Sequence, residues 1–198
     1  MEADWEVEIG GEAPVIETDW PGFIDLSTQP ERISEIAEAR TFLPLADLLS
    51  ALNLGNSQVW TSKCDIWEPE SSALACYIDL LPREAKVFAQ RQQAELFCRE
   101  IVARLNAAEL TERVPIRSIE GARQLGPERS FALVIRQAIA GQIAGFGITV
   151  YLSAKAESLV EAAEALASAM STFAGALLSI RLPVAFQPVH RDARDGLA

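Results

Sequence analysis

The residues whose side chains could carry out chemistry are charged and aromatic ones in two neighbouring segments. In each segment these residues alternate with apolar ones. Lys63, Asp65 and Trp67 recur at every second position of the first segment, and Tyr77 and Asp79 do so in the next. Facing carboxylates beside a lysine are typical of Mg²⁺ sites and of acid–base catalysis, whereas rings beside charges are typical of recognition surfaces. The candidate binding residues are Lys63, Asp65, Trp67, Tyr77, Asp79, Arg136 and Tyr151.

Other reactive residue types do not form a catalytic or metal-binding motif. The single histidine, His190, lies near the carboxyl end, where we expect a loose tail that cannot orient a catalytic base. Cys64, Cys76 and Cys98 are too widely spaced for a zinc motif, and their odd number argues against a disulfide framework. The glycines between positions 141 and 147 lack the strand–turn–helix context of a phosphate loop. We therefore predict no catalytic residue, no metal site and no cofactor.

Side-chain alternation is the property that places the candidates on one face of a sheet. Residues 58–67 and 74–81 form a predicted strand pair, and residues 130–139 and 145–153 form a second. Because successive strand residues point to opposite faces, the apolar set should lie beneath helices and the charged and aromatic set on the far side. The apolar set of the first strand is Trp60, Cys64 and Ile66, together with Ser62.

Helical periodicity predicts a long helix after each strand pair, at about 83–108 and at about 157–180. Strand–strand–helix thus occurs twice, over 58–108 and 130–180, as an architectural pseudo-duplication without residue identity. We predict an α+β fold: an antiparallel sheet with two long helices packed on one face, preceded by a helical and extended amino-terminal arm. Small residues on the last helix favour tight packing or a dimer seam: Ala162, Ala165, Ala169 and Gly175.

The domain organisation follows from charge and turn residues. Residues 1–27 form a predicted acidic arm with an edge strand near Trp5, residues 28–184 a single α+β domain, and residues 185–198 a flexible tail. Residues 112–120 could form another edge strand, because Pro115 cannot donate to a ladder.

Composition limits the classes of partner and compartment. The net charge is −11, and residues 1–40 hold eleven acidic and two basic side chains, so the remainder is almost neutral. A negative surface repels nucleic-acid phosphates and anionic lipid, so we expect neither nucleic acid nor membrane as partner. Unpaired cysteines and the lack of a signal peptide at the start favour a cytoplasmic location, and 14 Arg against three Lys favour a bacterial source.

These observations favour a non-enzymatic protein-interaction or self-association domain. The alternative is a small-molecule-binding protein or a hydrolytic enzyme that uses the polar sheet face. A simpler interpretation of that face is a solvated surface with cross-strand ion pairs such as Lys63–Asp79. A further one is that the acidic arm, with Trp5 and Trp20, folds back over it.

Overall fold

The computed structural model describes residues 2–112 and 128–180, which form an α+β fold around one sheet. The strands are β1 (Glu2–Val7), β2 (Ile16–Glu17), β3 (Val59–Glu70), β4 (Ala73–Pro82), β5 (Glu128–Ala140) and β6 (Ile143–Lys155). The helices are η1 (Pro30–Glu35), α1 (Ala37–Thr41), α2 (Leu43–Asn53), α3 (Ala85–Ala89), α4 (Arg91–Glu112) and α5 (Leu159–Ser179). The predicted strand at 112–120 and the predicted tail at 185–198, which contains His190, lie outside the described residues.

The sheet has the strand order β1-β5-β6-β4-β3 and is mixed. The hairpins β3–β4 and β5–β6 and the central β4–β6 pair are antiparallel, whereas β1 and β2 pair with β5 in parallel. The prediction of a purely antiparallel sheet is therefore wrong at this edge. Tight hairpins force antiparallel pairing, but no hairpin links β1 to β5, and a long connection permits either direction.

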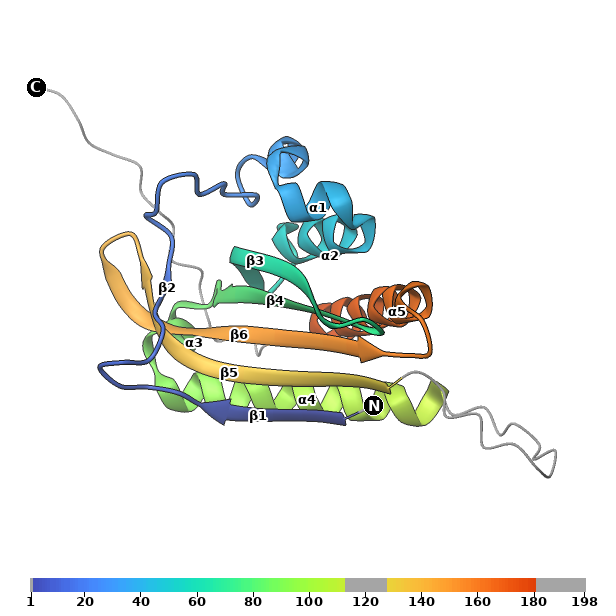
Figure 1. Ribbon diagram of the computed structural model, residues 1–198. Coiled ribbons are helices and arrows are strands. Elements are labelled where there is room, and N and C mark those ends of the chain that lie inside the picture. Colours follow the sequence, from blue (N-terminus) through green and yellow to red (C-terminus); the bar gives the residue numbers. More distant parts are fainter. Residues whose placement is uncertain (1, 113–127, 181–198) are drawn as a thin grey trace, which may run out of the picture.

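Both long helices pack against the same face of the sheet, as predicted. One core cluster joins Phe97 and Ile101 of α4, Leu166 and Phe173 of α5 and the inward side chains of β4, β5 and β6, such as Val150. Figure 1 shows α4 behind the long strands and α1 with α2 above β3. The opposite face of the sheet, which we call the far face, carries the candidate residues.

Helix α5 lies between the sheet and α2. It begins with a capping box, in which Ser158 and Glu161 exchange hydrogen bonds with each other's backbone. Ala162 and Ala169 are fully buried, so this part of the small-residue stripe packs within the fold and is not a dimer seam, whereas Gly175 is exposed. The helix is long and apolar enough to cross a membrane, but core helices of soluble proteins share this property.

A bulge in β3 corrects one predicted side-chain direction. Thr61 and Cys64 are three positions apart, yet the paired strand advances by only two residues between them. The extra residue reverses the alternation. Trp60, predicted to lie beneath the helices, is instead opposite Leu81 on the far face. There it packs beside a second, smaller apolar cluster that includes Ile16 of the arm.

Glycine permits close approach where the arm and α3 meet the sheet. A Cβ atom on Gly147 would lie 2.8 Å from Ile16 Cδ1, and one on Gly145 would lie 2.5 Å from both the ring and the carbonyl oxygen of Phe88. Gly141 has a φ of 61° in the two-residue turn between β5 and β6. Two-residue hairpin turns favour glycine because they require positive φ angles. These contacts hold β2 and α3 against the bent end of the sheet.

Candidate functional site

Three aromatic rings form a continuous row across β3, β4 and β6 on the far face. The ring centroids of Trp67 and Tyr77 are 6.3 Å apart, and those of Tyr77 and Tyr151 are 6.2 Å apart. The register explains the row, because Tyr77 is directly opposite Tyr151 on the neighbouring strand. Trp67 is 39% exposed. We call these three residues the aromatic strip.

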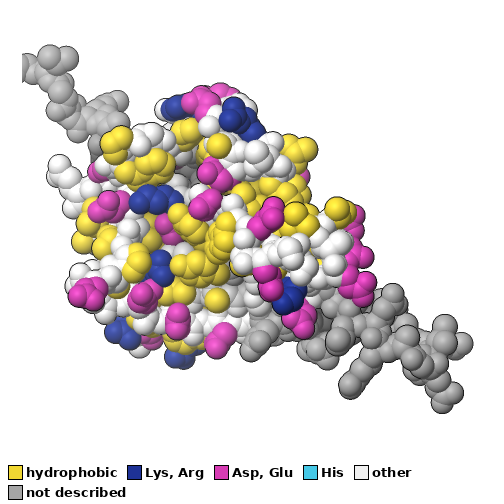
Figure 2. Space-filling view, viewed as in Figure 1, with side chains coloured by type: hydrophobic (Ala, Val, Ile, Leu, Met, Phe, Trp, Pro, Cys, Tyr) yellow, Lys and Arg dark blue, Asp and Glu magenta, His cyan; other side chains and the backbone are white. Residues whose placement is uncertain are grey.

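Carboxylates lie at both ends of the line of cross-strand neighbours that contains Tyr77 and Tyr151. Asp65 is the cross-strand neighbour of Tyr77 on β3, and Asp4 of β1 occupies the same row beyond Ala132 on β5. Both side chains are exposed. Figure 2 shows this side of the molecule, with hydrophobic side chains and some Lys or Arg side chains near the centre and acidic side chains around them. The row of rings therefore lies between two exposed carboxylates.

Arg136 is held in place beside the strip. Its guanidinium donates to Glu8 Oε2 at 2.7 and 3.1 Å and to the Tyr151 hydroxyl at 3.2 Å, and its central carbon lies 5.9 Å from the Tyr151 ring centroid. The Arg136 side chain is only 13% exposed. This positioned cation ties the arm to the sheet and orients Tyr151.

Asp79 is buried and already hydrogen-bonded. The Thr149 hydroxyl donates to Asp79 Oδ1 at 2.6 Å, and Asp79 is 6% exposed. Burial raises the pKa of Asp79, although the Thr149 bond and the positive charges of Arg136 and Lys63 partly oppose this rise. The predicted ion pair between Lys63 and Asp79 is replaced by this hydroxyl bond and by a contact of Lys63 with the arm.

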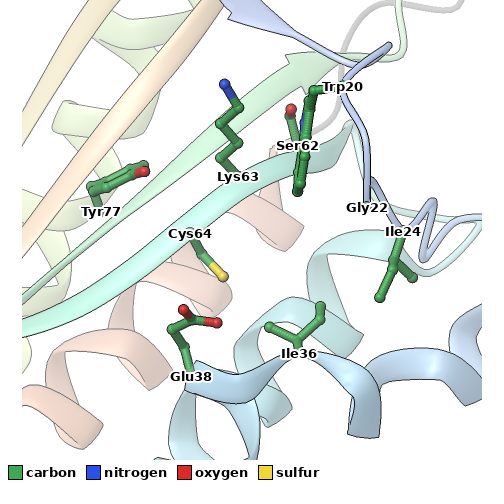
Figure 3. Close-up of a pocket in the computed structure, with 9 residues that line it drawn as sticks. All are labelled: Trp20, Gly22, Ile24, Ile36, Glu38, Ser62, Lys63, Cys64 and Tyr77. Carbon is green, nitrogen blue, oxygen red and sulfur yellow. The ribbon is translucent and has the colours of Figure 1, made fainter.

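Lys63 lies at a pocket of about 260 Å³ between β3, the arm and α1. Its Nζ atom is 5.7 Å from the ring centroid of Trp20, as in a cation–π contact. Figure 3 shows Glu38 of α1 and Cys64 of β3 below Lys63, with their ends toward each other. Tyr77 also lines the pocket, so the pocket adjoins the aromatic strip.

The thiols are poor nucleophiles. Burial raises the pKa of Cys64 to about 12, with the Glu38 carboxylate adding to the rise, and burial raises the pKa of Cys76 to about 12. Burial also raises the pKa of Cys98. All three cysteines are free, and protonated thiols do not act as nucleophiles or metal ligands near neutral pH.

The structure thus brings the seven candidate residues to the far face, but in two groups. Asp65 and Arg136 lie next to the aromatic strip and form one group with it. In the other group, Lys63 extends toward Trp20, and Asp79 is buried. The arm covers part of this face through Glu8 and Trp20, while Trp5 packs on the helix side.

Several residues of the site were not among the predicted candidates. Glu8 has a weak signal in the sequence, because Glu6 and Glu8 alternate with Trp5, Val7 and Ile9 in the arm. Glu38 has none, because its position depends on how α1 packs beside β3. Thr149 lies on the far face, two positions from Tyr151, but nothing in the sequence pairs it with Asp79.

Comparison with known proteins does not add to this description. Protein-family models, curated proteins and solved structures give no match. Across residues 2–112 and 128–180, no three His, Cys, Asp or Glu side chains lie together as metal ligands would. The function proposed below depends on the geometry of the far face.

Proposed function

We propose that this chain is a protein-interaction domain that binds an extended, basic segment of another protein across the aromatic strip. The observation that carries the proposal is the continuous row of Trp67, Tyr77 and Tyr151, in which Trp67 is exposed and both tyrosines are partly exposed, with an exposed carboxylate at either end. Tyrosine, tryptophan and arginine are the residues that contribute most binding energy at protein interfaces. Aromatic rows also suit extended and proline-containing segments.

The bonding of the polar groups favours binding over hydrolysis. A catalytic acid or base needs a free proton site within reach of a substrate. Asp79 instead accepts the Thr149 hydroxyl below the surface, and Arg136 is paired with Glu8. The buried thiols add no nucleophile, and they suit the reducing cytoplasm in which we expect the protein to act.

Charge favours a basic partner over a second copy of the chain. Two copies that meet through the far face would bring Asp4 and Asp65 toward like charges, whereas Lys or Arg side chains would be attracted. The sheet edges also oppose edge-to-edge pairing. The backbone N–H of Ile66 donates to its neighbour Asp65 at 2.7 Å, that of Trp5 donates to Asp4 at 2.7 Å, and β3 contains Pro69.

Selection from a random dodecapeptide phage library on the immobilised full chain tests the proposal. We expect enriched peptides with Lys or Arg beside aromatic, proline or aliphatic residues, and at least tenfold weaker binding to the Trp67→Ala variant. Peptides that bind the variant and the original chain equally would contradict the proposal. So would a stable dimer in light scattering that the Trp67→Ala variant does not form, because the second copy would then occupy the strip.

A further inference from the structure

The pocket beside the strip lies at the unpaired edge of β3. Lys63 and Cys64 are consecutive residues whose side chains point to opposite sides of the strand, yet both line the pocket. The pocket therefore includes the strand edge between them. Its other walls are Trp20 and Ile24 of the arm and the segment that leads into α1.

The pocket is apolar along its sides and has one acidic and one basic lining residue, Glu38 and Lys63. Ile24, Ile36 and the Trp20 ring supply the apolar surface. Glu38 is half-buried, and no side chain within residues 2–112 and 128–180 forms a hydrogen bond or ion pair with its carboxylate. A carboxylate at the end of an apolar slot matches a side chain that has a long aliphatic stem and a cationic head.

The size of the pocket suits one side chain. Pockets for whole small molecules usually measure about 300–1,000 Å³, and this one measures about 260 Å³. The ring of Trp20 lines the pocket, whereas its indole N–H is buried and has no hydrogen-bond partner among the described residues.

We infer that this pocket receives a lysine or arginine side chain of the bound segment, with the aliphatic stem between Trp20 and Ile36 and the cation at Glu38. The inference rests on the proposed function, because Tyr77 connects the pocket to the strip. Lys63 does not occupy this position, since its ammonium group extends away from Glu38 toward the face of Trp20.

Small amine probes test the pocket independently of any peptide. N-acetyl-lysine methylamide and its neutral analogue N-acetyl-norleucine methylamide, which has the same four-carbon stem without the amino group, are titrated into the ¹⁵N-labelled full chain up to about 10 mM, where a millimolar ligand saturates. We expect the lysine probe to shift the Trp20 indole signal and the amide signals of residues 36–38 and 62–64. The Glu38→Gln variant should weaken this binding at least fivefold, whereas Glu31→Gln, which changes the net charge equally at an exposed position, should not.

Each other outcome overturns the inference. If the norleucine probe binds as well as the lysine probe, the pocket does not select a cation. If neither probe shifts the pocket signals, or if the Glu38 and Glu31 variants behave alike, the carboxylate does not form the site. Failure of the proposed function would look different, because peptides would then bind without Trp67 while the amine probes still responded to Glu38.

Discussion

Replacement of Ile16 by alanine should loosen residues 14–20 of the arm, which include Trp20 in one wall of the pocket. Ile16 is 1% exposed and packs with Leu81, Phe88 and Ala138 on the far face. Its strand, β2, is only two residues long, so few backbone hydrogen bonds hold it. The arm also bonds through Thr18 to the backbone of β5 and of the turn that follows it, but Ile16 is the buried apolar side chain of β2.

The expected loss follows from the atoms removed. Ile16→Ala deletes three carbon atoms from a fully buried position, which at about 0.8 kcal/mol for each CH₂ gives about 2.4 kcal/mol. A residual cavity would add to this figure, but a short edge strand relaxes into part of the space. We therefore expect the free energy of unfolding to fall by about 2–3 kcal/mol. For a chain of this length, Tm should fall by roughly 4–12 °C.

The assay is urea and thermal unfolding followed by circular dichroism, with Ile143→Ala as the matched control. Ile143 is 62% exposed, so the same substitution there should change stability by less than about 0.5 kcal/mol. Amide exchange of residues 14–20 should accelerate in Ile16→Ala only. Equal stability of the two variants, with unchanged exchange in the arm, would refute the packing argument.

Three other substitutions test neighbouring parts of the account. Because burial raises the pKa of Asp79, the folded chain holds this proton more tightly than the unfolded chain, and stability falls as pH rises above about 4. Asp79→Asn, whose amide oxygen can still accept from Thr149, should therefore be more stable than the original chain in urea at pH 7 but not below pH ~4; a less stable variant at pH 7 would contradict this. Gly145→Ala should lower stability by about 1–3 kcal/mol in thermal melts, because its Cβ would collide with the Phe88 backbone; an unchanged melt would contradict that contact. Trp67→Ala should change stability by less than about 1 kcal/mol, because Trp67 lies at the surface, and a larger loss would indicate a structural role instead of a binding role.

Alternation and helical periodicity predicted the parts of the fold that depend on neighbouring residues. Both hairpins and the two long helices on one face were anticipated because each is encoded by local spacing. The period of two along each strand placed Tyr77, Asp79 and Tyr151 on the same face of the sheet. The pseudo-duplication stays a prediction, since the element order repeats but the sheet also contains β1 and β2.

The remaining features depend on contacts between distant segments. The parallel pairing of β1 with β5 joins residues more than a hundred positions apart, and no turn motif fixes its direction. The bulge that moved Trp60 to the far face has no local sequence signal. The Glu8–Arg136 pair and the approach of Glu38 to Cys64 likewise arise only once the arm and α1 are placed.

The most direct test of the central claim is the affinity of a selected dodecapeptide for the full chain, measured by calorimetry with single alanine variants. Trp67→Ala should weaken binding by at least tenfold, the loss of about 1.4 kcal/mol or more that truncation of an interface anchor produces. Leu96→Ala, which changes an exposed apolar residue on α4, should leave the affinity unchanged. Equal affinity of the Trp67 variant and the original chain would contradict the assignment of the aromatic strip as the binding surface.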